Sequence, residues 1–336
     1  MENMKFLVIG CGSIGKRHLR NLLSIGIKPG NIFAVDPRED RIEEIKNLGI
    51  SNFSNDYNNI IQEYKIDAAL ICSPTNLHIK QGIDLAKKNI HLFIEKPLDE
   101  NNENIIEFKS LVNSNNLIVA LAYVFRFSPL TQKVKDILSN DTLGKVMYVR
   151  GEFSEYLPDF HPYEDYRTFY MAKKDLGGGS ILDQSHIMDL IGYLFGEFKE
   201  VYAVNTNLSS LEISTDDIAE MIVNMDGGCL ASIHTDIFGR GHKKCLEVKA
   251  EKGNILIDFL DNTVSVYKSD SKSIEVFNKF SKDFNLNYID EINNFINSCN
   301  KKDRVMTSLE EGIKTMNLIL AAKQSHKTGK KEVIEA

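Results

Sequence analysis

The sequence predicts an α/β domain built on a parallel sheet, followed by an α+β domain with an open, mainly antiparallel sheet. Up to about residue 122, short apolar runs alternate with amphipathic stretches, which is the pattern of parallel strands covered by helices on both faces. After Tyr123 the strand candidates are longer and alternate in polarity, which is typical of antiparallel sheets. A chain of 336 residues also favours two cores over one. We therefore expect two domains, at residues 1–122 and 123–336.

Each element follows from these patterns. In the first domain we expect strands at 5–9, 32–36, 68–72, 91–95 and 118–122, and helices at 14–25, 38–48, 77–88 and 103–113. In the second domain we expect strands at 146–153, 218–224 and 230–236, and helices at 179–195, 288–299 and 308–323. The Asn-rich stretches at 52–59, 100–104 and 113–116 are interpreted as solvated loops and helix ends.

Composition and charge narrow the class of protein. The chain is 43% apolar and 26% charged, and no apolar run approaches the length of a membrane span. Its net charge of -7 argues against a general binder of nucleic acid or of anionic membranes. The apolar run near the N-terminus is too short for a signal peptide, so we expect a cytoplasmic protein. Five scattered cysteines without a C-x-x-C pair indicate neither a disulfide framework nor a zinc site.

The first chemical motif is Gly10-Cys11-Gly12-Ser13-Ile14-Gly15, which follows a predicted strand and opens a predicted helix. Here Gly10 would permit the tight turn, Gly12 would let a pyrophosphate approach the backbone, and Gly15 would let helix and strand pack closely. The N-terminus of the helix attracts phosphate charge. In this context the motif predicts a dinucleotide-binding domain of the Rossmann type, in which Ser13 and Ile14 also line the cofactor.

The residues that end the second strand bear on the choice between NAD and NADP. Asp36 follows Gly15 at the spacing where a carboxylate accepts hydrogen bonds from both ribose hydroxyls, which favours NAD. Arg38 is the counter-evidence, because its guanidinium could stack on adenine or bind a 2′-phosphate. A charge on the surface at a helix start is the plainer interpretation of Arg38. We expect NAD, with NADP as the alternative.

Two further strand ends carry polar segments at the edge where parallel sheets bind ligands. Ser73-Pro74-Thr75-Asn76 could line the cofactor, although Thr75 or Asn76 could instead cap the next helix. We interpret His78, just beyond, as a surface residue of the first helical turn. Glu95-Lys96-Pro97 repeats the geometry one strand later, and the proline keeps Lys96 extended. We expect Glu95 and Lys96 to contact the cofactor, and Lys96 to contact the substrate as well. A solvated lysine before a loop is the alternative.

The segment Gly177-Gly178-Gly179, whose glycines would let the backbone approach a ligand closely, leads into a predicted helix. This helix carries Asp183 and His186 on one turn. Oxidation of a secondary alcohol needs a base at the hydroxyl, and an imidazole held by a carboxylate suits neutral pH. We therefore expect Asp183, His186 and Lys96 to be the catalytic residues, with Lys96 stabilising the alkoxide charge. The same residues leave Lys96 open as the base, with His186 as a donor. A helix cap and a satisfied core histidine are the structural alternatives.

These motifs together resemble those of the glucose-fructose oxidoreductase, inositol dehydrogenase and MocA family over nearly the whole chain. The resemblance implies a Rossmann domain, an open sheet that builds homodimers or homotetramers, and NAD(P)-dependent chemistry on sugars or cyclitols. It implies that Lys96 lies beside the nicotinamide before a cis Pro97, and it extends the substrate contacts to Tyr123 and Arg126 of Tyr123-Val124-Phe125-Arg126-Phe127. Asp183 and His186 stand three residues apart, whereas many family members have four. Tyr166 and Arg167 are further candidate substrate contacts, with a surface-loop role as the alternative.

The sequence therefore predicts an oxidoreductase that transfers a hydride between NAD and a secondary alcohol of a sugar, nucleotide sugar or cyclitol. A similarity around Tyr156, Glu164 and Tyr170 suggests surface-glycan or sialic-acid-like sugars. The alternatives are a redox-neutral enzyme that recycles bound NAD, and a sensor that binds cofactor and sugar without turnover. We expect no bound metal and no partner among nucleic acids or membranes.

Overall fold

A computed structural model describes residues 4–160, 162 and 164–335. Within these residues the contacts divide the chain into two compact units. The first contains residues 4–123 and 285–312, and the second contains residues 124–284 and 313–335. The sequence analysis placed 285–312 in the second domain. Helix α9 (Asn285–Cys299) instead contributes Phe295 and Ile296 to the core of the first unit, where the ring of Phe295 lies 5.7 Å from that of Phe93.

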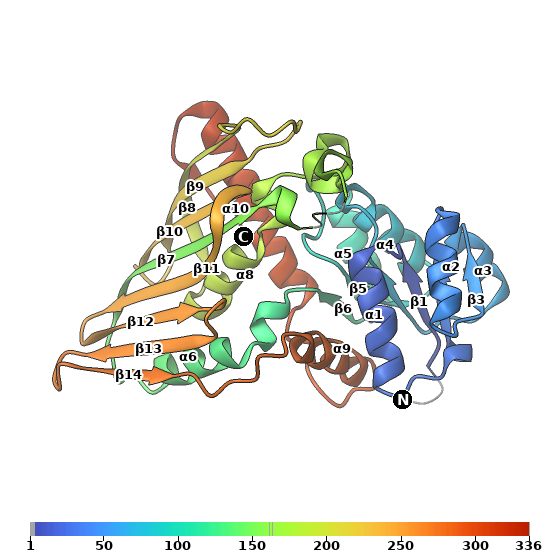
Figure 1. The fold of residues 1–336 in the computed structure, drawn as a ribbon, viewed down its shortest axis with the longest axis horizontal. Coiled ribbons are helices and arrows are strands. Elements are labelled where there is room, and N and C mark those ends of the chain that lie inside the picture. Colours follow the sequence, from blue (N-terminus) through green and yellow to red (C-terminus); the bar gives the residue numbers. More distant parts are fainter. Residues whose placement is uncertain (1–3, 161, 163, 336) are drawn as a thin grey trace. The chain divides into compact units, whose positions relative to one another are not determined.

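The first unit contains a six-stranded parallel sheet in the order β3-β2-β1-β4-β5-β6 (Figure 1). This is the strand order of a dinucleotide-binding Rossmann domain, as predicted. The strands are short and mostly buried on both faces, which explains their continuous apolar sequence. Their bounds are β1 (Phe6–Ile9), β2 (Ile32–Val35), β3 (Asn52–Ser54), β4 (Ala68–Ile71), β5 (His91–Ile94) and β6 (Val119–Leu121).

Helices connect these strands, and α4 and α5 line a pocket described below. The bounds are α1 (Ser13–Ser24), α2 (Glu39–Asn47), α3 (Tyr57–Glu63), α4 (His78–Ala86) and α5 (Ile105–Ser114). The interpretation of residues 52–59 as solvated loops and helix ends missed strand β3, whereas the start of α3 at Tyr57 is a helix end. The Asp56 carboxylate accepts the backbone N–H of Asn58 and caps α3, and Ile60 is buried. Short polar elements of this kind give too little apolar periodicity to be predicted.

The second unit contains a nine-stranded sheet in the order β14-β13-β12-β11-β7-β10-β9-β8-β15. Every neighbouring pair is antiparallel except β7 with β10, which agrees with the predicted mainly antiparallel sheet. The bounds are β7 (Val146–Tyr156), β8 (Phe198–Thr206), β9 (Ile218–Met225), β10 (Leu230–Asp236), β11 (Phe238–Ala250), β12 (Gly253–Asp258), β13 (Thr263–Lys268), β14 (Ser273–Phe277) and β15 (Glu332–Val333).

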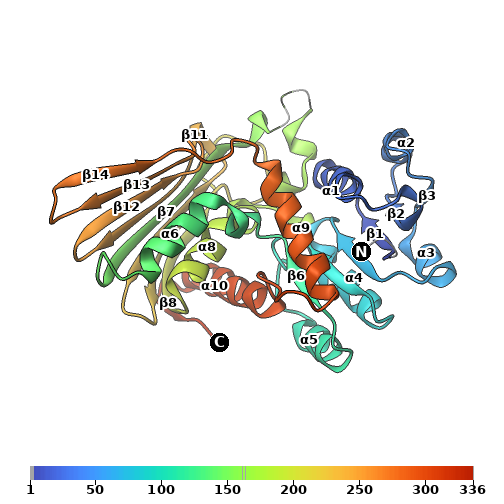
Figure 2. The ribbon, with the colours of Figure 1, turned by 90° about the horizontal axis from the view of Figure 1, so that it is seen from below.

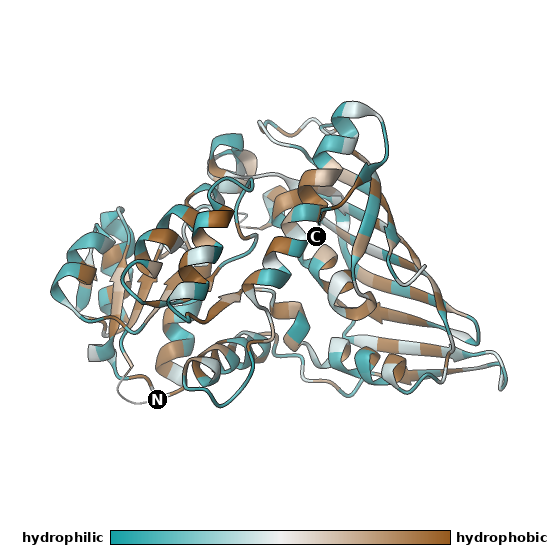
Figure 3. Ribbon diagram, turned by 180° about the vertical axis from the view of Figure 1, so that it is seen from behind, coloured by the Kyte–Doolittle hydropathy of each residue, from teal (hydrophilic) through white to brown (hydrophobic). Residues whose placement is uncertain are grey.

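Helices α6 (Pro129–Ser139), α8 (His186–Phe195) and α10 (Leu309–Thr328) run along one face of this sheet (Figure 2). Gly151 of β7 faces α8, where an added Cβ would lie 2.5 Å from Ile187. The strands alternate in hydropathy along their length (Figure 3). On the opposite face, which we call the outer sheet face, Tyr202, Ile222 and Leu256 are exposed.

No helix in the part of the chain that the structure describes is both long and apolar enough to cross a membrane.

Candidate active site

Strands β1, β2, β4 and β5 of the first unit end at one edge of the sheet. Ile9 pairs with Val35 and with Ile71, and Ile71 pairs with Ile94, so the segments that follow these strands are neighbours. The predicted glycine turn, Asp36, Ser73 and Lys96 all follow directly. The sequence prediction that these segments share one edge is therefore confirmed for the first unit. This edge is where sheets of this topology bind dinucleotides.

The glycine-rich turn has one position that packing does not explain. An added Cβ at Gly10 would lie 2.5 Å from the Cys72 carbonyl oxygen, and one at Gly15 would lie 2.0 Å from the Gly10 oxygen. Both glycines are thus required by the fold. An added Cβ at Gly12 would lie at an ordinary 3.7 Å from Arg41. Gly12 is also the N-cap residue of α1, and no side chain caps this helix. The turn therefore fits a pyrophosphate, which needs close access to backbone N–H groups at Gly12, Ser13 and Ile14.

Asp36 is held beneath this turn. It is 1% exposed, and one carboxylate oxygen accepts the backbone N–H of Cys11 at 2.7 Å and Nη1 of Arg41 at 3.1 Å. Its other oxygen accepts the backbone N–H of Arg38 at 3.0 Å. The Arg38 guanidinium itself pairs with Asp40 at the surface. The cation beside Asp36 is therefore Arg41, five residues further along the chain in the first turn of α2, and the sequence analysis did not single it out.

His78 occupies a different place from the one predicted. It was interpreted as a surface residue, but it is 1% exposed at the start of α4. Its Nδ1 lies 2.9 Å from the Pro97 carbonyl oxygen, and its Nε2 lies 2.9 Å from the Ser73 carbonyl oxygen. The Lys96–Pro97 peptide bond is cis, as the resemblance implied. The Pro97 contact joins residues 19 apart in sequence, so the local pattern could not reveal it.

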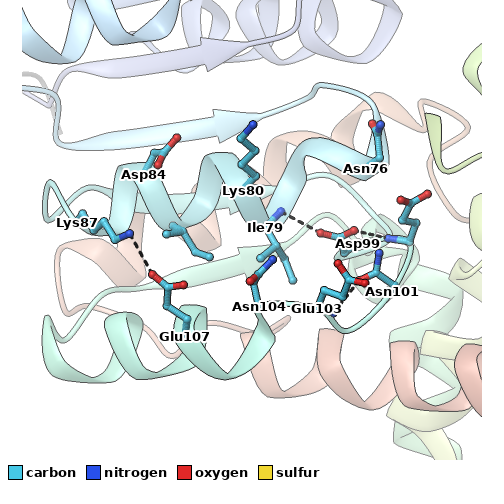
Figure 4. Close-up of a pocket in the computed structure, with 12 residues that line it drawn as sticks. Asn76, Ile79, Lys80, Asp84, Lys87, Asp99, Asn101, Glu103, Asn104 and Glu107 are labelled. Atoms are coloured by element: carbon cyan, nitrogen blue, oxygen red, sulfur yellow. Dashed lines mark hydrogen bonds and ion pairs between the residues drawn. The ribbon is translucent and has the colours of Figure 1, made fainter. Parts of the chain in front are cut away.

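The start of α4 is capped by a residue from another segment. Neither Thr75 nor Asn76 caps the helix; instead, Oδ2 of Asp99 accepts the backbone N–H of Ile79 at 3.3 Å (Figure 4). Thr75 is buried within the short 3-10 turn before the helix. Burial raises the pKa of Asp99 to about 6. Asp99 also lines a pocket of about 430 Å³ beside α4 and α5.

Glu95 faces the protein interior. Its carboxylate lies 2.8 Å from Nε2 of His18 on α1, and both side chains are largely buried. The ring of His18 packs edge-on against Phe93 and Tyr288. Glu95 was predicted to contact the cofactor, and its carboxylate is used here to join β5 to the helix that begins at the glycine turn.

In the second unit, Asp183 and His186 do not lie on one continuous helix, so that prediction is wrong. Asp183 ends α7 (Ser180–Asp183), and His186 begins α8. The break follows from Gln184, whose backbone leaves the helical region and whose side-chain amide donates to the buried Asp236 carbonyl oxygen at 2.9 Å. Asp183 is largely buried and accepts a hydrogen bond from the Tyr170 hydroxyl.

Two of the three glycines before α7, Gly178 and Gly179, pack against the protein itself. An added Cβ at Gly178 would lie 2.2 Å from the Tyr170 oxygen, and one at Gly179 would lie 2.3 Å from Oδ1 of Asp216. The same Asp216 accepts the backbone N–H of Ile181 at 2.9 Å and so caps α7. The expectation that these glycines admit a ligand is corrected, because their close approach serves the start of α7.

The imidazole of His186 lies in an aromatic cluster. The Phe125 ring stands edge-on to it, with centroids 5.2 Å apart. Phe125 in turn contacts Phe153, Phe259 and Phe284. This places His186 against an apolar wall, which the sequence indicated only through the aromatic motif at 123–127. Tyr123 of the same motif is fully buried in the first unit.

Three other predicted substrate contacts make bonds within the second unit. Arg126 donates to both oxygens of Asp189, from Nε at 2.9 Å and from Nη2 at 2.6 Å. Arg167 pairs with Asp165 and Glu212 at the surface. The Tyr166 hydroxyl accepts the backbone N–H of Glu212 at 3.1 Å.

Comparisons with known proteins agree with this architecture. Residues 4–123 match the model of the oxidoreductase family with an NAD-binding Rossmann fold, and residues 131–256 match the model of the GFO/IDH/MocA C-terminal domain. The chain belongs to the Gfo/Idh/MocA family. It is therefore an NAD-binding oxidoreductase. Among the described residues there is no group of three or more His, Cys, Asp or Glu side chains that could hold a metal ion.

Relatives within the Gfo/Idh/MocA family match both units. The chain is 29% identical over 332 residues to myo-inositol 2-dehydrogenase of Thermotoga maritima, covering 96% of each protein. It is 25% identical to the NAD(+)-dependent scyllo-inositol 2-dehydrogenase of Bacillus subtilis, covering 98% of this chain and 95% of the relative. A solved structure of levoglucosan dehydrogenase in complex with NADH superimposes with a TM-score of 0.89 at 18% identity, covering 99% of each chain, which establishes the shared fold.

Proposed function

We propose that this protein oxidises, or in reverse forms, a secondary alcohol of a cyclitol or sugar with NAD. The likeness to an inositol dehydrogenase carries the proposal, because it covers 96% of the chain and so includes the second unit as well as the cofactor domain. The narrower substrate, a surface-glycan or sialic-acid-like sugar, is one arm of the substrate test below.

The first unit would hold the cofactor through the glycine turn and Asp36. The backbone at Gly12, Ser13 and Ile14 would bind the pyrophosphate, and the Asp36 carboxylate would accept hydrogen bonds from the ribose hydroxyls. When bound, the nicotinamide supplies the acceptor for the hydride. The hydrogen bonds from the backbone N–H groups of Cys11 and Arg38 keep the Asp36 carboxylate fixed.

For the proton we propose His186 as the base and Lys96 as the cation that stabilises alkoxide charge on the substrate. His186 stands against the Phe125 ring, which restricts its rotation. Asp183, held by Tyr170, would act as a substrate contact or orient the imidazole. The reverse assignment, with Lys96 as the base, makes a different prediction for the pH dependence.

The test is absorbance of the reduced nicotinamide with NAD and NADP, over a panel of inositols, monosaccharides, nucleotide sugars and sialic-acid-like sugars. We expect turnover of a cyclitol or sugar with NAD. Lys96→Met should lower kcat by at least about a hundredfold, the scale of a lost electrostatic contact in the transition state. Lys87→Met is the matched control, because Lys87 is an exposed lysine paired with Glu107 on the same unit. A failure of the whole panel would favour a sensor.

The pH dependence of kcat/KM distinguishes the two assignments of the base. If His186 accepts the hydroxyl proton, alcohol oxidation should fall at low pH with one ionisation, because imidazolium cannot accept it. His186→Ala should remove that limb together with most of the activity. If His186→Ala keeps both the acidic limb and the activity, Lys96 is the base instead.

We also propose that the protein forms homodimers or homotetramers through the outer sheet face. Tyr202 and Ile222 are directly paired across β8 and β9, and both are more than 40% exposed there. Such apolar patches are typical of interfaces. Light scattering should report a multimer that Ile222→Lys weakens, and a monomer for the unmutated protein would overturn this proposal.

A further inference from the structure

His78 connects two of the segments that follow strands at the candidate cofactor edge. Both of its ring nitrogens lie 2.9 Å from main-chain carbonyl oxygens, one of Ser73 and one of Pro97. Ser73 belongs to the segment after β4, and Pro97 directly follows Lys96 after β5. The side chain comes from α4 and is almost completely buried. A histidine in this place is a cross-link between two loops and not a surface residue.

The cross-link extends toward the glycine turn on one side. An added Cβ at Gly10 would lie 2.8 Å from the backbone nitrogen of Ser73, so the glycine turn packs directly on the segment that His78 holds. On the other side, Asp99 accepts the backbone N–H of Ile79 next to His78 (Figure 4). The start of α4 therefore contacts the segment after β4 at Ser73 and the segment after β5 at Pro97 and Asp99.

The chemistry of the ring makes the two contacts unequal. A carbonyl oxygen only accepts hydrogen bonds, and a neutral imidazole carries one N–H. Burial lowers the pKa of His78 and favours the neutral ring, while the carbonyls and Glu95 favour the cation and Lys96 opposes it. In the neutral ring, one nitrogen donates to its carbonyl and the other faces its carbonyl with a lone pair. Each of the two contacts can therefore be tested by a donor placed at one ring position.

We propose that His78 is a positioning residue of the dehydrogenase, which holds Lys96 by donating a hydrogen bond from Nδ1 to the Pro97 carbonyl oxygen. This inference rests on the proposed function. The N–H is assigned to Nδ1 because the Pro97 contact is buried, whereas the Ser73 contact is only partly buried, so a Pro97 oxygen without a donor would cost more free energy.

The experiment uses the two amides that imitate one ring nitrogen each. His78→Asn places a donor near the Nδ1 position, and His78→Gln places one near the Nε2 position. We expect His78→Asn, which keeps a donor for the Pro97 oxygen, to leave kcat at saturating NAD within about threefold. We expect His78→Gln, which lacks that donor, to lower kcat about tenfold, while calorimetry shows NAD affinity within about threefold for both variants.

The control is His91→Gln, a partly buried histidine at the other end of β5 that accepts the backbone N–H of Ile118. It reports the general cost of losing a histidine contact in this unit. A kcat that falls in His78→Gln but not in His78→Asn or in the control supports the proposal. Equal effects of Asn and Gln on kcat, or the reversed pattern, would overturn it, because a purely structural residue has no reason to depend on which ring position carries the donor.

Failure of the His78 proposal can be distinguished from failure of the proposed function. If the unmutated protein turns over no substrate, the proposed function fails, and the ¹⁵N resonances of the His78 ring still show whether Nδ1 carries the N–H. If the variants do not fold, the unmutated protein is labelled with ¹⁵N in its histidine rings. The His78 ring N–H should then be protected from exchange and its resonance should shift when NAD is added. An unshifted resonance at saturating NAD would overturn the proposal.

Discussion

The buried ion pair between Arg126 and Asp189 gives a prediction that separates a structural role from substrate binding. Both residues are 2% exposed, and the guanidinium donates to both carboxylate oxygens, with Tyr193 4.6 Å away on its face. Asp189→Asn keeps the shape and removes the charge, so the guanidinium stays buried without this carboxylate. Breaking a buried pair from one side costs about 3–5 kcal/mol. We expect Asp189→Asn to lower the free energy of unfolding by about this amount.

The double variant Arg126→Met with Asp189→Leu should recover much of the loss, because apolar replacement of both partners avoids the desolvated charge. The chain has no tryptophan, so unfolding in urea is followed by circular dichroism, and amide exchange in α8 reports the local effect. Asp40→Asn, which breaks the exposed Arg38–Asp40 pair, is the control and should change stability by less than about 1 kcal/mol. If Arg126→Met keeps full stability but raises the KM for substrate, our reasoning is refuted and Arg126 is a substrate contact.

Two further predictions concern charge. The unmutated protein should bind NAD more tightly than NADP in calorimetry, and Asp36→Ala should narrow this difference in affinity. Tighter binding of NADP would overturn the assignment of Asp36 to the ribose hydroxyls and would assign the 2′-phosphate contact to Arg41. The hydrogen bond to Asp236, together with a second one to Glu220, raises the pKa of the His234 imidazole to about 9. The pKa of His234 in the folded protein exceeds its unfolded value of about 6.5. The protonated imidazole therefore contributes at most about 3 kcal/mol to the free energy of unfolding below pH 6.5, and this contribution is lost as the pH rises through 9. The stability gap between the unmutated protein and His234→Gln should therefore shrink between pH 6 and pH 9.5 in urea unfolding, and a gap independent of pH would contradict it.

The parts of the fold that the sequence predicts are those determined by neighbours in the chain. The continuous apolar runs of β1, β2, β4 and β5 require burial on both faces, and their common edge follows from parallel topology alone. Gly10 could be assigned a structural role because its backbone angle φ of 88° is set by the local turn. By contrast, β3 and α3 are short and polar, and they are ordered by pairing with β2 and by the cap at Asp56.

The parts that the sequence could not predict depend on contacts between distant residues. The glycines before α7 suggested room for a ligand, but Asp216 fills the space beside Gly179 from 37 residues along the chain. Spacing suggested that Asp183 and His186 share a helix turn, but the side chain of Gln184 is bonded to Asp236 and the helix breaks between them. In both cases the local pattern was compatible with two structures, and a tertiary hydrogen bond selected one.

The neighbours of Lys96 show how such distant contacts define a functional side chain. Glu95 is fixed by the buried His18 of α1, and the carbonyl of Pro97 is fixed by the buried His78 of α4. Lys96 is thus carried on a backbone segment that is held on both sides by side chains from different helices of the same unit. A side chain on a loop is placed precisely only when the backbone of the loop is supported. The two histidines supply that support from two helices of the first unit.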